Sequence, residues 1–297
     1  MLRPFLLLLV FVLPNLQGIS AQGETQLYLF NITRTPDKLY HIYGPKFLSG
    51  FNPGGYTNQP FFTSAGDILV SVRKAGETQN DIWLLSPAAK KCKQLTSTKA
   101  NEYSPQLRST GDYYSVVRQV EGEPIDQQVF QFPIHGGTYE SLTPDMKDIG
   151  YYGWVKPDDL ALYRIEGQSN QLMSYNVQEH KSKRITTSIG RTLISDGKGG
   201  VYYIHKFSET YWYIKKYSET STVIDIVAET PSKSEDFAIA PDGTFFMGKD
   251  QKLMYLSPED HNTWKECGDL SVYGIQHISR MSVSPDGKQL ALVASKE

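Results

Sequence analysis

The chain has 297 residues, of which 39% are hydrophobic and 21% charged, and its formal net charge at pH 7 is −2. This composition is typical of a globular protein and excludes a long disordered block. A charge so near zero gives no basis for binding nucleic acid or an anionic membrane through a broadly basic surface. The many Tyr, Phe and Gly residues favour strands and turns over helices.

The N-terminal residues 1–21 have the pattern of a secretory signal peptide. Arg3 supplies the positive start, and Phe5–Leu13 is an apolar run too short to span a bilayer. Pro14 ends that run, and small residues precede a predicted cleavage after Ala21. We therefore expect a periplasmic or secreted protein whose mature part, residues 22–297, is one domain. No later segment is long and apolar enough to predict a membrane span.

A short turn motif recurs along the rest of the chain with a period of about 44 residues. Its clearest copies are Ala240-Pro241-Asp242-Gly243 and Ser284-Pro285-Asp286-Gly287, and degenerate copies begin at Ser64, Ser109, Lys156 and Ser195. This period fits four short strands with their turns, which is one blade of a β-propeller.

Each repeat contains a run of predicted strands separated by turn residues. In chain order the predicted strands are 59–63, 68–72, 81–85 and 93–96; 105–107, 113–117, 128–132 and 139–143; 152–155, 160–165, 172–177 and 184–187; 191–194, 201–205, 211–217 and 222–227; and 236–239, 244–247, 253–256 and 263–267.

The last repeat has only two predicted strands, at 280–283 and 289–294. Two unassigned strands, 26–30 and 38–43, precede the first full repeat, and we expect them to form the outer half of the last blade. Such pairing closes the ring and leaves no long open sheet edge. The sequence therefore predicts an all-β fold, a six-bladed β-propeller with four-stranded antiparallel blades.

These repeats resemble those of TolB-like propellers, which are related to the WD-repeat class and marked by Ser-Pro-Asp-Gly turns. The nearest matches are Ser284-Pro285-Asp286-Gly287, Tyr103-Ser104-Pro105, Asp81-Ile82-Trp83 and Gln94-Leu95-Thr96, and the resemblance covers residues 26–295. It implies the propeller fold and says little about activity.

The chain departs from two kinds of propeller protein that carry a second domain. TolB has an α/β domain before its propeller and contacts partners of the Tol-Pal system, whereas here a strand is expected almost directly after the predicted signal peptide. Prolyl-oligopeptidase-type enzymes carry an α/β-hydrolase domain, but the chain has no Gly-x-Ser-x-Gly motif to indicate one.

No motif in the sequence indicates a cofactor, a metal site or a catalytic residue. The six histidines show no zinc-binding spacing, and no nucleotide-binding loop or EF-hand occurs. Cys92 and Cys267 are expected on the outer strands of the first and fifth blades, too far apart for a disulfide. We therefore predict two free thiols.

Aligning the repeats places polar and aromatic residues where the inner strands begin, at one mouth of the central channel. The candidate ligand-binding residues are Asn58, Gln59, Glu102, Tyr103, Tyr151, Tyr152, Arg191, Glu235, Asp236 and Arg280. Arginine and aromatic side chains are common anchors of binding sites. The alternative is that these groups pair with one another and with water to plug the channel.

Three functions remain open on the sequence alone. The first is an exported binding or scaffold propeller, a monomer that recognises an envelope or extracellular protein, a peptide or a polar ligand at the channel mouth. The second is a hydrolase or lyase acting on a glycan or lactone, and the third is a purely structural envelope component. The first is favoured because the fold supplies a surface and the sequence supplies no catalytic motif.

Overall fold

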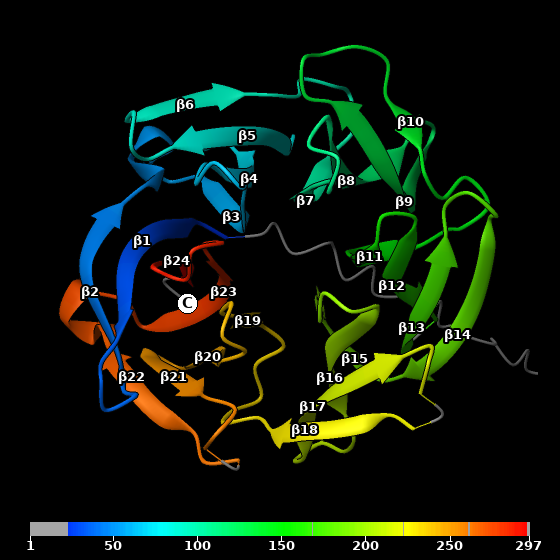
Figure 1. The fold of residues 1–297 in the computed structure, drawn as a ribbon. Coiled ribbons are helices and arrows are strands. Elements are labelled where there is room, and N and C mark those ends of the chain that lie inside the picture. The colour runs from blue at the N-terminus through cyan, green and yellow to red at the C-terminus, as the bar shows by residue number, and fades with distance from the viewer. Residues whose placement is uncertain (1–22, 168, 222, 261, 296–297) are drawn as a thin grey trace, which may run out of the picture.

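The computed structural model describes residues 23–167, 169–221, 223–260 and 262–295. The predicted signal peptide, residues 1–21, lies outside these residues. Six four-stranded antiparallel sheets are arranged around a central channel (Figure 1). The predicted six-bladed β-propeller is therefore confirmed. No helix among the described residues is long and apolar enough to cross a membrane.

The first three blades follow the chain without interruption. Blade 1 consists of β3 (Tyr56–Phe62), β4 (Ile68–Arg73), β5 (Asp81–Ser86) and β6 (Lys91–Gln94); blade 2 of β7 (Glu102–Leu107), β8 (Tyr113–Val120), β9 (Glu123–Pro133) and β10 (Glu140–Ser141); and blade 3 of β11 (Ile149–Lys156), β12 (Asp159–Glu166), β13 (Ser169–Asn176) and β14 (Lys181–Thr187).

The remaining blades complete the ring. Blade 4 consists of β15 (Ile189–Ser195), β16 (Gly200–Lys206), β17 (Trp212–Ser218) and β18 (Asp225–Glu229); blade 5 of β19 (Phe237–Ile239), β20 (Phe245–Lys249), β21 (Lys252–Leu256) and β22 (Lys265–Asp269); and blade 6 of β23 (His277–Val283), β24 (Gln289–Ser295), β1 (Thr25–Arg34) and β2 (Tyr40–Phe47). Two short 3-10 helices, η1 (Ser49–Phe51) and η2 (Leu270–Tyr273), lie between strands.

The ring is closed by the N-terminal strands, as predicted. Strand β1 pairs with β24 from Thr25↔Ser295 to Asn31↔Gln289, and β2 pairs with β1 on the outside. The two ends of the propeller are therefore joined by an ordinary antiparallel ladder within one blade.

The recurring turn joins the inner strand of a blade to its second strand. In blade 5, Gly243 N donates to the Ala240 carbonyl at 2.9 Å, and Gly243 has φ +88°, a left-handed conformation that favours glycine. Blade 6 repeats this geometry at Gly287. In blade 3 the motif has no glycine, and Lys156 pairs directly with Asp159 across a two-residue turn.

The core is a ring of six hydrophobic clusters among the described residues, each lying between two neighbouring blades. Between blades 3 and 4, for example, Leu172 packs with Ile189, Val201 and Tyr203. No cluster lies on the channel axis, because the inner strands send alternate side chains toward the next blade and toward the channel.

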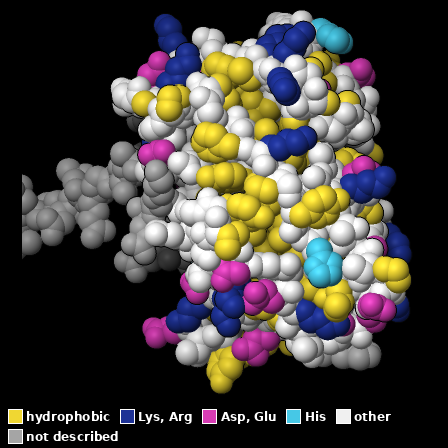
Figure 2. Space-filling model, turned by 90° about the vertical axis from the view of Figure 1, so that its left-hand side faces the viewer, with side chains coloured by type: hydrophobic (Ala, Val, Ile, Leu, Met, Phe, Trp, Pro, Cys, Tyr) yellow, Lys and Arg dark blue, Asp and Glu magenta, His cyan; other side chains and the backbone are white. Residues whose placement is uncertain are grey.

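Figure 2 shows the side of the ring that carries the outer strands of blade 6, where hydrophobic side chains gather across the surface. Among the exposed large hydrophobic residues are Tyr43 and Phe47 of β2 and Val272 and Tyr273 of η2. The Phe47 ring contacts Tyr28, with 5.3 Å between ring centroids.

Cys92 lies in β6 and Cys267 in β22, and both are free thiols. The prediction of two unpaired cysteines on outer strands is confirmed.

Candidate functional site

A cavity of about 680 Å³ occupies the central channel and is lined by the inner strands of all six blades. We call the end where these strands begin the strand-start end, and the end where they turn back the turn end. The lining extends from a layer containing Gln59, Ser104 and Tyr151 to turn residues such as Gly197 and Pro285. The cavity thus reaches the turn end of the channel.

Bulges in the inner strands set the inner limit of this cavity. The register in which β3 pairs with β4 shifts between Asn58 and Phe61. The inner strands β7, β11, β15 and β23 show a register shift at a corresponding place in their pairing with the second strand of their blade. In β3 the unpaired residues are Gln59, with φ 56°, and Pro60, which has no N–H to leave unpaired. Ser104 has the same left-handed backbone, with φ 51°, and its N–H donates to Gln59 Oε1 at 2.7 Å.

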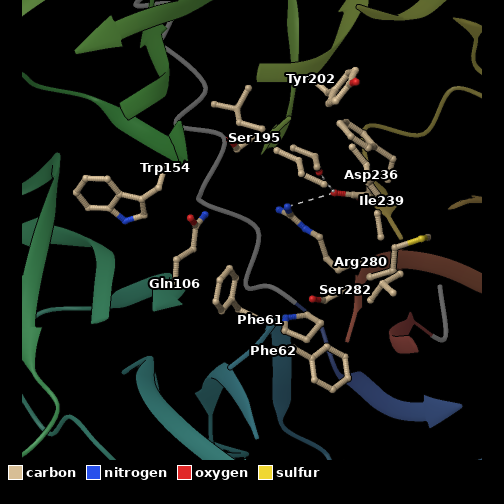
Figure 3. Close-up of a pocket in the computed structure, with 18 of the residues that line it drawn as sticks. Phe61, Phe62, Gln106, Trp154, Ser195, Tyr202, Asp236, Ile239, Arg280 and Ser282 are labelled. Carbon is tan, nitrogen blue, oxygen red and sulfur yellow. Dashed lines mark hydrogen bonds and ion pairs between the residues drawn. The ribbon is translucent and has the colours of Figure 1, made fainter. Parts of the chain in front are cut away.

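Three charged side chains meet at the level of the bulges, and we call them the charged layer: Arg191, Asp236 and Arg280. Arg191 Nε donates to both carboxylate oxygens of Asp236, at 3.0 and 3.2 Å, and its Nη2 contacts Oδ2. Arg280 Nη1 lies 3.2 Å from Asp236 Oδ1. Figure 3 shows Arg280 and Asp236 facing Gln106 and Trp154 across the channel.

Asp236 is held as a carboxylate. Its side chain is only 3% exposed, and this burial opposes ionisation, but the guanidinium groups of Arg280 and Arg191 outweigh it and lower the pKa of the carboxyl group. Thr192 Oγ1 also donates to Asp236 Oδ1 at 3.1 Å. The layer therefore contains one firmly ionised carboxylate between two cations.

Arg280 has fewer partners than Arg191. Its guanidinium carbon lies 4.8 Å from the centre of the Tyr151 ring, a favourable cation–π distance. Among the described residues, its contact with Asp236 is its only ion pair, and no further hydrogen-bond partner is found for its remaining N–H groups. Two guanidinium groups and one carboxylate leave the layer with one uncompensated positive charge.

Tyrosines gather around the charged layer. The Tyr151 and Tyr163 rings meet edge to face, with 5.4 Å between centroids. Tyr56, at the start of β3, lies close enough to Arg280 and Arg191 to interact with them electrostatically, although burial raises the pKa of its hydroxyl group. Tyr103 accepts a hydrogen bond from Asn80 Nδ2 at 3.2 Å.

The structure brings part of the predicted site together. Gln59, Tyr151, Tyr152, Arg191, Asp236 and Arg280 line the cavity. Asn58, Glu102, Tyr103 and Glu235 do not. Tyr152 is largely buried, and its hydroxyl donates to Ser115 Oγ at 2.8 Å.

Asn58 and Glu235 support the site from behind. Asn58 Oδ1 accepts a hydrogen bond from Gln59 N at 2.7 Å. Glu235 accepts one from Arg191 N at 3.1 Å and forms an ion pair with Lys206. These contacts fix the backbone that carries the lining residues.

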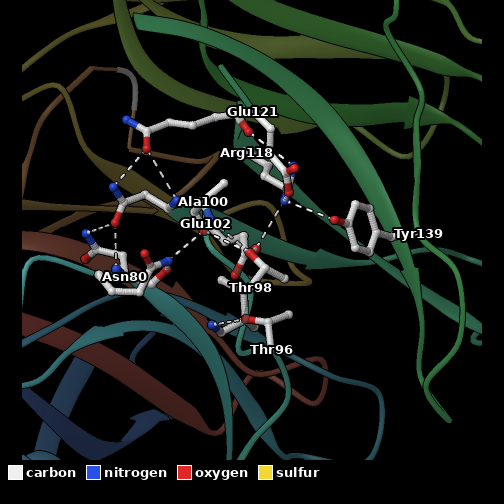
Figure 4. A network of polar contacts seen from close by, with 12 residues as sticks. Asn80, Thr96, Thr98, Ala100, Glu102, Arg118, Glu121 and Tyr139 are labelled. Carbon is white, nitrogen blue, oxygen red and sulfur yellow. Dashed lines mark hydrogen bonds and ion pairs between the residues drawn. The ribbon is translucent and has the colours of Figure 1, made fainter. Parts of the chain in front are cut away.

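Glu102 belongs to a separate buried network between blades 1 and 2 (Figure 4). It is fully buried, accepts a hydrogen bond from Thr98 and lies 3.3 Å from Arg118 Nε. Arg118 Nη2 in turn pairs with Glu121 at 3.0 Å and donates to the Tyr139 hydroxyl at 3.1 Å. Burial raises the pKa of Glu102 to about 7 in spite of the Arg118 charge.

The sequence did not indicate the wall of the cavity. Phe61, Gln106, Trp154 and Tyr202 line it, and none of them was among the predicted site residues. Trp154 is held in place because its indole N–H donates to Ser115 Oγ at 2.8 Å and the Arg108 guanidinium lies over its ring. Successive side chains of a strand point to opposite faces, and this alternation along each inner strand is the signal that could have separated channel-facing from blade-facing residues.

Among the described residues, no group of three or more His, Cys, Asp or Glu side chains is placed so that it could hold a metal ion.

No protein-family model matches the chain, and no curated protein matches it by sequence. Solved structures do match. TolB from Agrobacterium tumefaciens is 15% identical with a TM-score of 0.66, and the match covers 92% of this chain and 98% of that one. TolB from Acinetobacter baumannii is 13% identical with a TM-score of 0.58, covering 91% of this chain and 64% of that one.

A solved oligogalacturonate lyase from Vibrio parahaemolyticus is also similar, with 10% identity and a TM-score of 0.52, and the match covers 93% of this chain and 99% of that one. The chain therefore has the TolB-like six-bladed propeller fold expected from its turns. At these identities the similarity concerns the fold, which proteins of different function share.

Proposed function

We propose that the chain is an exported binding protein that holds a protein segment, a peptide or a polar small molecule in its central channel. The observation that carries this proposal is the cavity of about 680 Å³ with a preformed charged layer at its inner limit. Most ligand sites are concave and largely apolar, with a few fixed polar groups that orient the ligand. The channel has both features.

The polar groups of the channel are fixed before any ligand arrives. Asp236 holds Arg191 through both of its carboxylate oxygens, and the Tyr151 ring lies beside the Arg280 guanidinium. Side chains that are already ordered lose little conformational freedom on binding, which favours affinity.

The charged layer is better suited to binding than to proton transfer. A general acid or base works best with a pKa near the working pH. The two guanidinium groups instead hold the pKa of Asp236 below its ordinary range. The carboxylate is therefore a weak base and a poor proton donor at neutral pH.

The proposal of export depends on the predicted signal peptide, residues 1–21. Expression in a secreting host should give a mature protein that begins at Gln22, and the intact mass of the recovered protein tests this. Recovery of the uncleaved chain from the cytoplasm would contradict export. We also propose that the mature protein is a monomer, which light scattering during size-exclusion chromatography tests.

Channel binding is tested by affinity capture from an extract of the source cells with two forms of the purified chain. The first is the unaltered chain, and the second is the Arg191→Ala/Arg280→Ala double variant, whose circular dichroism spectrum must match that of the unaltered chain at the assay temperature. We expect a partner on the first that is lost from the second. A partner that both forms capture equally would place binding on an outer face of the propeller. An Arg184→Ala variant serves as the control, because it should capture the same partner as the unaltered chain.

A further inference from the structure

The channel cavity has two chemically different parts, and together they indicate what kind of ligand fits. At its inner limit lies the charged layer of Arg191, Asp236 and Arg280. Toward the turn end the wall is largely apolar, with Phe61 and Trp154 among the lining residues. A ligand that fills both parts therefore needs a polar head and an apolar body.

The charge of the head follows from the ion pairs around the cavity. Asp236 neutralises only one of the two guanidinium groups that contact it. The other acidic groups nearby are neutralised elsewhere, since Glu235 pairs with Lys206 and Asp196 pairs with Lys216 at 2.7 Å. One positive charge is left without a counter-ion among the described residues.

The uncompensated charge is best assigned to Arg280. Arg191 uses both Nε and Nη2 on Asp236, whereas Arg280 uses one nitrogen atom and keeps further N–H groups without a partner in the described part of the chain. The Arg280 side chain is 14% exposed and lines the cavity. Arg280 shares the single Asp236 carboxylate with Arg191, so its charge is only partly compensated and an anionic ligand is favoured beside it.

We propose that the channel binds a monocarboxylate with an apolar or aromatic body, which enters from the turn end with its carboxylate leading. This inference depends on the proposed channel-binding function. A single carboxylate matches the single surplus charge and fits the planar fork of a guanidinium group. Its body then packs against the Phe61 and Trp154 side of the cavity. A peptide C-terminus and a small organic acid share this chemistry.

The test compares acids with their uncharged amides. The probes are 3-phenylpropionate and 3-phenylpropionamide, and N-acetyl-Gly-Phe as the free acid and as the C-terminal amide. Affinities are measured by isothermal titration calorimetry, and weak binding by ligand-observed NMR, on the purified chain and on Arg280→Met. Arg184→Met, which changes an exposed arginine on the outer strand of blade 3, is the matched control.

We expect each acid that binds to do so at least about tenfold more tightly than its amide, since a charge-assisted hydrogen bond is worth that much. Arg280→Met should remove this preference, and Arg184→Met should keep it. Tighter binding of the peptide acid than of 3-phenylpropionate identifies a peptide C-terminus as the source, and the reverse order identifies a small organic acid.

Equal affinity for acids and amides, a preference that survives Arg280→Met, or no binding of any probe would overturn the carboxylate proposal. Amide binding that Trp154→Leu weakens would show that the channel still binds ligands, so the proposed function would stand without this inference. If Arg280→Met does not fold, Arg280→Lys keeps a cation beside Asp236 without the planar fork, and we expect it to lower the acid preference severalfold.

Discussion

At the scale of single residues, the channel depends on one carboxylate. Asp236 is nearly inaccessible, yet it contacts two guanidinium groups and the Thr192 hydroxyl. It lies just before β19 (Phe237–Ile239), and its side chain lines the channel cavity. Removing one partner from such a buried set leaves the others unpaired and is costly.

A second buried carboxylate should make stability depend on pH. Folding raises the pKa of Glu102 from 4.5 to about 7, chiefly through burial, so the folded chain binds this proton more tightly than the unfolded chain. The free energy of unfolding should therefore fall by roughly 2 kcal/mol as the pH rises from about 4.5 to 7. Asp81, with its pKa raised by burial to about 6, contributes in the same direction.

Urea unfolding at several pH values checks this prediction. In Glu102→Gln the decline should become shallower, whereas Glu121→Gln, which alters an exposed carboxylate on the same Arg118, should keep it. A Glu102→Gln variant with the full pH dependence of the unaltered chain would show that another group causes it.

The two thiols should differ in reactivity because only one is accessible. Cys92 is exposed, whereas Cys267 is buried and burial raises the pKa of its thiol to about 12. Ellman's reagent should modify one thiol rapidly at pH 8 and the second only after denaturation. Cys92→Ser should abolish the rapid phase, and a rapid phase that persists in this variant would contradict the buried position of Cys267.

At the scale of strands, neighbouring blades approach closely at glycine positions. A Cβ atom on Gly153 of β11 would lie 2.4 Å from the Leu193 carbonyl oxygen of β15, and a Cβ on Gly248 of β20 would lie 2.9 Å from the Ile278 carbonyl oxygen of β23. Because the carbonyl oxygens that a new Cβ would meet belong to the backbone of the neighbouring strand, no flexible side chain can move aside to make room. These contacts fix the distance between the inner strands of adjacent blades.

Gly153→Ala should therefore destabilise the chain by about 2–4 kcal/mol, a cost expected when a core position is overfilled against backbone. Gly23→Ala, whose new methyl group would meet nothing within 4 Å, should change stability by no more than about 0.5 kcal/mol. Chemical denaturation of both variants measures the difference. Equal stability would mean that blades 3 and 4 can separate slightly without cost.

At the scale of the whole molecule, closure of the ring makes the six blades depend on one another. Each hydrophobic cluster among the described residues needs two adjacent blades, and blade 6 needs strands from both ends of the chain. Loss of β1 and β2 would expose the faces of blades 5 and 1 that pack on them. It would also free the edge of β24 for pairing with other chains.

A variant lacking residues 24–47 should therefore lose cooperative thermal unfolding and aggregate. Circular dichroism and light scattering during heating measure both effects. As a control, addition of a separate peptide spanning residues 24–47 should restore part of the cooperative transition. A truncated chain that melts as sharply as the full chain would show that five blades and a half-blade are stable alone.

The sequence by itself determined the fold, because blade geometry is local. Turns such as Ala240-Pro241-Asp242-Gly243 specify a hairpin through the φ of their own residues, and alternation within each strand marks it as one layer of a sheet. The repeat period then fixed the number of blades, and the two unassigned N-terminal strands indicated how the ring closes. Each of these inferences needs contacts only within a blade or between the chain ends.

Only the tertiary structure decided what faces the channel. Arg191, Asp236 and Arg280 come from three blades, and their contacts join residues that lie 44 or more positions apart along the chain. The bulges at Gln59 and Ser104 decide whether a nearby side chain points into the channel or into the interface between blades. The repeat alignment does not contain this information, and it therefore grouped Glu102 with the channel although Glu102 is buried between blades 1 and 2. A bulge of one residue reverses the direction of a side chain, and its place depends on packing that the repeat alone does not specify.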